Sequence, residues 1–540
     1  MKVCLLYGDR EWTNGETYYD PASIIQDLGL NTMFSAASQE ITYENGSVKQ
    51  VEKPDRYLAE TMRNVMMVPL TTEEEILYRQ ESVEESLQHE EMTRALYRIS
   101  NDVVQKWNEL GRGFREKMRL GSPVMKLTSD IRVLHLFCEA LTEIRELLGK
   151  EQLTSRGYTA LREELGRAFS EEKEASVRKI LNDISFYVYG LEHKEEDNHD
   201  TVVKPRIVWE CGLEDGLKLS SMELVDISSQ NTRFFRRGST RDKLQKFING
   251  RIPDSFSVTE DERILEQTHQ LEFETVSYVM RLTKEFTREF QTFFDQLRLQ
   301  SAFFLATVQL RHHLRRLGME WCYPEVCDRR DLEFTELREF VMGLQQRVNV
   351  IGNTCSLLQK DLLIVTGANQ GGKSTFLRSI GIAQVMMQSG LPVAAKSYRS
   401  GIFPRIFVHF TRREDSEMNS GRLDEELKRM SGIIDQIGDG SLILLNESFA
   451  TTTEKEGSVI AYDITKALKE AGVRILTVTH LLSFAKRVHE ETAGHPESGV
   501  EFLSAERKPD GTRTYHMIYG QPELTSFGLD LYDSIVGAVW

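Results

Sequence analysis

A glycine-rich loop at residues 367–375 has the residue types and the spacing needed to bind phosphate groups. Its sequence, Gly-Ala-Asn-Gln-Gly-Gly-Lys-Ser-Thr, fits the pattern G-x-x-x-x-G-K-[ST]. The glycines allow backbone amides to turn toward a phosphate, and a following helix adds partial positive charge at its amino end. Lys373 is expected to reach the β- and γ-phosphates, and the Ser374 hydroxyl to bind Mg²⁺. We therefore predict that ATP binds at Gly367, Asn369, Gly371, Gly372, Lys373, Ser374 and Thr375.

Two later positions predict hydrolysis of the bound nucleotide. The apolar run 441–445 ends in Asn446 and Glu447, where phosphate-loop ATPases place an acidic magnesium-shell residue and then a glutamate that orients water. Asn446 and Ser374 form the predicted metal site. Because Asn446 is neutral, this site has one negative charge fewer than in other phosphate-loop ATPases, which is consistent with low turnover. Glu447 is the predicted general base. His480 follows the run 473–479 and is predicted to sense the γ-phosphate; the alternative for an isolated histidine is a structural role.

The apolar runs around these residues predict the elements that position them. After Pro324, strand-like runs at 362–366, 441–445 and 473–479 alternate with helical segments, which indicates a mostly parallel α/β sheet. The runs 500–505 and 514–519 flank Pro509-Asp510-Gly511, the pattern of a β-hairpin.

Residues before Pro324 have a different pattern of apolar and polar residues. Residues 1–70 show few sustained periods, and from about Thr71 the pattern becomes helical. Apolar residues recur at spacings of three or four through 83–110 and again through 264–308, which predicts two amphipathic helices much longer than average. Helices of this length suggest an elongated helical body; a plain helical bundle is the alternative.

A basic segment lies between the two long helical patterns. Residues 201–228 suggest one or two β-hairpins, and residues 233–246 contain six arginines and lysines with a single acid. Cations can bind a nucleic-acid backbone by releasing its counterions. We predict DNA contacts at Arg233, Arg236, Arg237 and Arg241; the alternative is a solvated or partner-facing loop. The net charge of −16 over 540 residues restricts any DNA contact to a local basic face.

Composition limits the class of protein. The length exceeds that of a single hydrophobic core, so several domains are expected. The six cysteines are scattered, and the pair Cys322 and Cys327 has no second pair or nearby histidine to complete a zinc site. The amino-terminal apolar run is too short for a signal peptide, and no stretch has 18 consecutive apolar residues. We expect a cytoplasmic protein.

These motifs together resemble the MutS family of DNA mismatch-repair ATPases. The family's phosphate loop reads Thr-Gly-Pro-Asn-Met-Gly-Gly-Lys-Ser, and this chain keeps the characteristic asparagine as Asn369. Tyr323-Pro-Glu resembles the family's Arg-Pro-Glu lead-in, and 350–353 lies where the family enters its ATPase core. Thr479-His480 matches the family's Thr-His, and 526–529 resembles its Ser-Tyr-Gly-Leu. The resemblance is specific over 320–537 and looser over 60–320.

The resemblance implies a multidomain α + α/β fold. We expect an irregular connector at 1–70, a helical core and lever domain at 71–320 with a short β-containing insertion near 201–250, and a P-loop (ABC-like) ATPase domain at 321–540. It implies ATP and Mg²⁺ as cofactors, and a homodimer whose ATP sites are each completed by the other subunit. Ser420 is the candidate for that contact. The family's mismatch-reading amino-terminal domain has no visible counterpart, so the chain resembles a short form.

Three functions are compatible with these features. The first is a MutS-like ATPase whose dimer motions bind double-stranded or branched DNA in mismatch repair or recombination. The second is an ATP-gated DNA or protein clamp with little hydrolysis, for which Asn446 is the reason. The third, a transporter-type or cohesin-like ATPase, is disfavoured because the Leu-Ser-Gly-Gly-Gln signature is absent.

Overall fold

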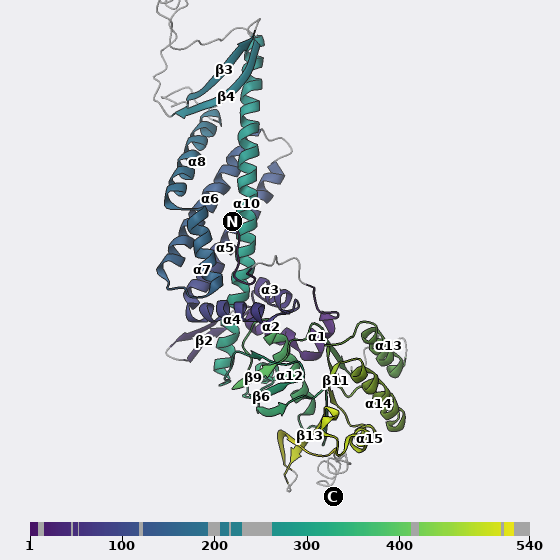
Figure 1. Ribbon diagram of the computed structural model, residues 1–540. Coiled ribbons are helices and arrows are strands. Elements are labelled where there is room, and N and C mark those ends of the chain that lie inside the picture. Colours follow the sequence, from purple (N-terminus) through teal and green to yellow (C-terminus); the bar gives the residue numbers. More distant parts are fainter. Residues whose placement is uncertain are drawn as a thin grey trace, which may run out of the picture. The chain divides into compact units, whose positions relative to one another are not determined.

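The computed structural model describes residues 1–8, 16–44, 47–51, 53–117, 123–192, 206–214, 218–228, 262–411, 421–508 and 512–522 (Figure 1). The chain divides into two compact units. One unit comprises Met1–Val3, Ala95–Gln152 and Leu161–Arg298, and the other comprises Cys4–Arg94, Leu153–Ala160 and Leu299–Trp540. Within the described residues, no helix combines the length and the apolarity that a membrane span requires.

The first unit is mainly helical. Its elements are most of α5 (Glu90–Lys117), α6 (Pro123–Lys150), most of α7 (Arg156–Ala168), α8 (Glu171–Glu192), the first part of α10 (Glu262–Arg316), and the antiparallel hairpin of β3 (Arg206–Glu214) and β4 (Lys218–Ser228). An aromatic cluster packs α5, α6 and α10 together. The ring of Phe137 stacks on that of Phe294 with 5.2 Å between the ring centroids, and the Trp107 ring centroid lies 5.9 Å from that of Phe137. The hairpin confirms the β structure expected near 201–228, whereas Arg233, Arg236, Arg237 and Arg241 lie outside the described residues.

The two long helical patterns have different outcomes. The pattern at 264–308 is one continuous helix, α10, of 55 residues, as predicted. The prediction of a single helix through 83–110 is wrong, because α4 (Glu73–Gln88) ends at Gln88 with His89 as its C-cap, and α5 begins at Glu90. The Thr93 hydroxyl lies 3.2 Å from the carbonyl oxygen of Ser86 and 3.1 Å from that of His89. A side chain that satisfies backbone carbonyls in this way stabilises a break that periodicity does not reveal.

The second unit contains a six-stranded sheet. Its strands, in spatial order, are β10 (Ile406–Phe410), β11 (Leu442–Asn446), β12 (Arg474–Val478), β8 (Leu362–Thr366), β13 (Val500–Arg507) and β14 (Arg513–Tyr519). All neighbours are parallel except β13 and β14, which are antiparallel. Every residue of β8, β10 and β12 is buried, as expected for parallel strands covered on both faces. The predicted mostly parallel sheet and its terminal antiparallel pair are confirmed.

Helices cover both faces of this sheet (Figure 1). Ile364, Ile443 and Ile475 share a core with α13 (Arg422–Ile434), α14 (Glu454–Glu470) and α15 (Leu482–Thr492). Alternate residues point to the opposite face, where Leu444 approaches Gly381 of α12 (Lys373–Met387). A four-stranded sheet completes the unit, in the order β5 (Glu325–Val326), β9 (Ser397–Ser400), β6 (Leu332–Leu337) and β7 (Asn353–Leu357). Helix α11 (Phe340–Gln346) lies between β6 and β7 in sequence.

The expectation of irregular structure at 1–70 is wrong. This segment forms α1 (Pro21–Leu28), α2 (Leu30–Ala37), the antiparallel strands β1 (Ile41–Glu44) and β2 (Ser47–Val51), and α3 (Arg56–Met66). Leu28 packs against Gly381 of α12, and the Tyr19 ring lies 5.9 Å from Phe407 of β10. Helices α1 and α2 have eight residues each, too few to show a clear period, and burial against the sheet domain stabilises them instead.

Candidate nucleotide site

The loop between β8 and α12 has a backbone that requires glycine. Gly367 and Gly372 have φ values of +112° and +91°, in the left-handed region that favours glycine. A Cβ atom at Gly367 would lie 2.8 Å from the Ala505 amide nitrogen, and one at Gly371 would lie 2.8 Å from the Ala505 Cβ. Strand β13 therefore packs closely against the loop, and Gly367 and Gly371 allow this approach because they have no side chain.

Lys373 is the first residue of α12 and is held inside the loop. Its side chain is 4% exposed, and its Nζ donates hydrogen bonds to the carbonyls of Gly367 at 2.8 Å and Ala368 at 2.9 Å. The N-cap of α12 is Gly372, which provides no side-chain hydrogen bond to the first turn. The first amides of a helix have no acceptor within the helix, so this terminus suits an anion.

Glu447 and His480 are brought together by the sheet. They follow the adjacent parallel strands β11 and β12, so both lie at the carboxyl edge where β8 ends in the phosphate loop. His480 Nδ1 lies 3.9 Å from Glu447 Oε1. The neighbouring His480 lowers the pKa of the Glu447 carboxyl, burial opposes this effect, and Lys373 adds to it. The result is a carboxylate that is ionised at neutral pH.

Asn446 has an unsatisfied acceptor. It is the last residue of β11, and its Oδ1 is buried without a hydrogen-bond partner among the described residues. A buried acceptor in this condition is unfavourable unless a ligand or water donates to it. Ser374 begins the first turn of α12 with Lys373. A hydroxyl in the first turn of α12 and an amide oxygen at the end of β11 fit the coordination shell of a magnesium ion bound to a nucleotide.

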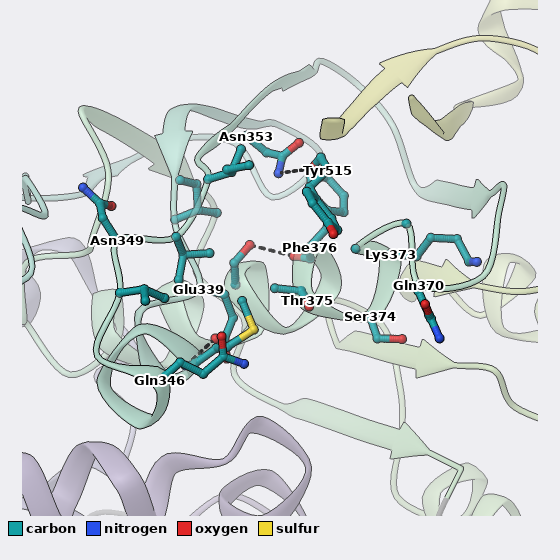
Figure 2. A pocket seen from close by; sticks show the side chains of 18 of the residues that line it. Glu339, Gln346, Asn349, Asn353, Gln370, Lys373, Ser374, Thr375, Phe376 and Tyr515 are labelled. Atoms are coloured by element: carbon teal, nitrogen blue, oxygen red, sulfur yellow. Dashed lines mark hydrogen bonds between the residues drawn. The ribbon is translucent and has the colours of Figure 1, made fainter. Parts of the chain in front are cut away.

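A cavity of about 480 Å³ lies beside the phosphate loop. Figure 2 shows Asn349 and Lys373 on opposite sides of it, with Tyr515 between them. Of the predicted residues, Gly371, Gly372, Lys373, Ser374, Thr375 and Glu447 line the cavity. Asn369 is an exposed residue of the loop, and Ser420 lies outside the described residues.

One wall of the cavity comes mostly from residues that the sequence motifs did not identify. Val348, Ile351 and Tyr515 are each 45% exposed and give the wall an apolar surface. Tyr515 has a φ of +62°, and Asn353 holds its backbone: Nδ2 donates to the Tyr515 carbonyl at 3.2 Å, and Oδ1 accepts from Met517 N at 2.8 Å. The resemblance at 350–353 indicated one part of this wall; no local signal marked Tyr515.

Comparisons with known proteins agree with this architecture. The family model described as MutS domain V matches residues 363–535, and the one described as the MutS2 N-terminal domain matches residues 71–196. The first match covers the phosphate loop, Asn446, Glu447 and His480, and the second covers α4 to α8. Both regions were those in which the sequence resembled MutS proteins.

Curated relatives include proteins named Endonuclease MutS2. That of Streptococcus sanguinis is 28% identical over 201 residues, which are 37% of this chain and 25% of the relative. That of Streptococcus gordonii is 32% identical over 161 residues, covering 30% and 20% respectively. That of Streptococcus thermophilus is 27% identical over 239 residues, covering 42% and 29%. The matched regions span less than a third of these relatives. With both family models and the phosphate-loop architecture in agreement, the chain belongs to the MutS family.

Proposed function

We propose that the chain binds ATP with Mg²⁺, hydrolyses it, and uses nucleotide-dependent motions of a homodimer to bind double-stranded or branched DNA in repair or recombination. The observation that carries the ATPase part is the meeting of three features at one cavity. These are the buried ammonium of Lys373, the amino end of α12 without a side-chain cap, and the ionised Glu447 beside His480. DNA association draws support from the family and from relatives named Endonuclease MutS2.

Binding of the triphosphate uses groups that are already in place. Lys373 donates to two loop carbonyls, and phosphate oxygens offer the ammonium a charged acceptor in place of these neutral ones. The loop amides and the α12 terminus add donors without a large rearrangement, because the glycine backbone already has its turned conformation. Preorganised donors of this kind stabilise charge that develops during phosphoryl transfer.

Hydrolysis requires a group that orients and deprotonates water. Glu447 is ionised at neutral pH and lines the cavity next to the loop, so it can accept that proton. His480 keeps the pKa of this carboxyl below its ordinary value. Bound Mg²⁺ would neutralise charge on the phosphates, and Ser374 with Asn446 would hold its shell.

The apolar wall suits the nucleotide base. Val348, Ile351 and Tyr515 present partly exposed apolar and aromatic surface in the same cavity as the phosphate loop, and the Tyr515 ring lies beside Gly372 of that loop. Aromatic and aliphatic side chains of this kind stack on a purine ring, while a few polar groups fix its orientation. Asn353 keeps Tyr515 in the conformation that forms this wall.

The second candidate function, an ATP-gated clamp with little hydrolysis, is favoured by one observation. The neutral Asn446 stands where a carboxylate would strengthen magnesium binding, and its Oδ1 has no partner among the described residues. Single-turnover hydrolysis separates the two functions. A Glu447→Gln variant should lose hydrolysis but keep ATP binding; turnover equal to that of the unmodified protein would favour the clamp.

Nucleotide and DNA binding are tested separately. Lys373→Ala should remove nearly all ATP affinity in calorimetry, and intact affinity would contradict the site.

A panel of homoduplex, mismatched, junction and single-stranded DNA, titrated with and without ATP, tests the DNA part. Arg236→Glu together with Arg237→Glu should weaken DNA binding and flatten its salt dependence. ATP turnover that DNA does not change, together with no DNA binding at low salt, would reject the DNA part of the proposed function. The nuclease activity in the relatives' names is not extended to this chain.

A further inference from the structure

The segment that follows β11 has an unusual backbone. Glu447 has a φ of +54° and Phe449 a φ of +65°, which are left-handed values that side-chain-bearing residues rarely adopt. Such a conformation persists only where surrounding contacts hold it. The direction in which the Glu447 side chain leaves the sheet therefore depends on whatever fixes residues 447–451.

The side chain of Glu426 in α13 makes two of these contacts. It is 6% exposed. Its Oε1 accepts a hydrogen bond from Phe449 N at 3.0 Å, and its Oε2 accepts one from the Thr451 hydroxyl at 2.6 Å. A carboxylate that accepts a backbone amide and a hydroxyl in a buried place makes charge-assisted hydrogen bonds, which are stronger than neutral ones. Phe449 N would lose its acceptor if this side chain were removed.

Thr411 connects Glu426 to Glu447 itself. The Thr411 hydroxyl lies 2.7 Å from the Glu447 carbonyl oxygen and 3.2 Å from Glu426 Oε1. The backbone of Glu426 contributes as well, because its carbonyl is 3.2 Å from His409 Nε2, and His409 Nδ1 is 2.7 Å from the Ser448 hydroxyl. One residue of α13 thus fixes consecutive positions after the strand.

We propose that Glu426 is a positioning residue for hydrolysis, which holds Glu447 in the orientation that a general base needs. The proposal rests on the proposed function, since it concerns the same site. Glu426 is not among the residues that line the cavity, and it acts through Thr411 and residues 447–451. Its loss should leave ATP binding intact and slow the chemical step, because misplacement of a catalytic group by about 1 Å costs on the order of 100-fold.

The test uses a matched buried glutamate as control. Glu85 of α4 is 3% exposed and accepts from the amides of Thr154 at 2.8 Å and Ser155 at 2.5 Å, away from the cavity. Steady-state kinetics and thermal melting are measured for Glu426→Ala and Glu85→Ala. Glu426→Ala should lower kcat about 10- to 100-fold, with KM for ATP within about twofold. Glu85→Ala should lower the melting temperature similarly but leave kcat within about twofold.

A conservative variant and a double variant make the test specific to positioning. In Glu426→Gln the amide carbonyl can accept from Phe449 N while the amide nitrogen donates to the Thr451 hydroxyl, so most of kcat should return. In a Glu447→Gln background, Glu426→Ala should slow the residual single-turnover hydrolysis no further, because it acts through Glu447. If Glu426→Ala does not fold, Thr451→Val removes one contact and should lower kcat several-fold.

The outcomes separate the two proposals. If Glu447→Gln abolishes hydrolysis while Glu426→Ala matches Glu85→Ala in kcat, the positioning role is wrong and the proposed function stands. Additive losses in the double variant overturn the positioning role as well. If Glu447→Gln hydrolyses ATP at the normal rate, the general-base assignment fails and the positioning role fails with it.

Discussion

Replacing Gly371 by alanine tests whether close packing of β13 shapes the phosphate loop. A Cβ atom at this position would lie 2.8 Å from the Ala505 Cβ and 2.9 Å from the Ala368 carbonyl oxygen. Ordinary carbon–carbon contacts are about 3.5 to 4.0 Å, so the loop or β13 must move by nearly 1 Å. Overpacking of this size costs about 1 to 3 kcal/mol. Because the same movement displaces the phosphate-binding amides, ATP affinity should fall about 5- to 150-fold if most of that cost appears in binding.

Calorimetric titration with ATP and a thermal melt together measure the effect. Gly438→Ala is the matched control, because a Cβ there meets nothing within 4 Å. Its unfolding free energy should stay within about 0.5 kcal/mol of the unmodified protein, and its ATP affinity should be unchanged. A folded Gly371→Ala protein that binds ATP as well as the Gly438→Ala control would refute the argument that β13 sets the loop geometry.

Three further variants probe the cavity. Tyr515→Ala should weaken ATP binding about fivefold or more, since aromatic stacking on a base is worth about 1 to 3 kcal/mol; competition by inorganic tripolyphosphate should not change, and an equal loss for both ligands would contradict base stacking. His480 lowers the pKa of the Glu447 carboxyl, and activity is lost as the pH falls through that pKa because the base becomes protonated. His480→Ala should therefore raise this pKa and shift the acidic limb of the kcat–pH profile to higher pH. Asn446→Asp restores a negative charge beside the metal, so half-maximal activity should need less Mg²⁺; an unchanged magnesium titration would place Asn446 outside the metal shell.

The phosphate loop, its flanking strand and the two residues predicted to act in hydrolysis could be identified from the sequence. Their geometry is local: glycines permit the turned backbone, a lysine opens the helix, and apolar runs specify buried parallel strands. Glu447 and His480 could be named because adjacent parallel strands end at one edge of a sheet. The long helix α10 was predictable for a similar reason, since its period repeats over many turns.

Only the tertiary structure decided which other residues share the cavity. Tyr515 reaches it because Asn353, 162 positions earlier, bonds to its backbone, and no local pattern encodes a contact at that separation. The same holds for α1, whose short sequence becomes helical by burial against α12 and β10. Glu426 looks like any charged residue of an amphipathic helix until the fold places it under residues 447–451. A local stretch of sequence determines those conformations that neighbouring residues along the chain can stabilise. Where a side chain is held by residues distant in sequence, its position is determined only by the assembled fold.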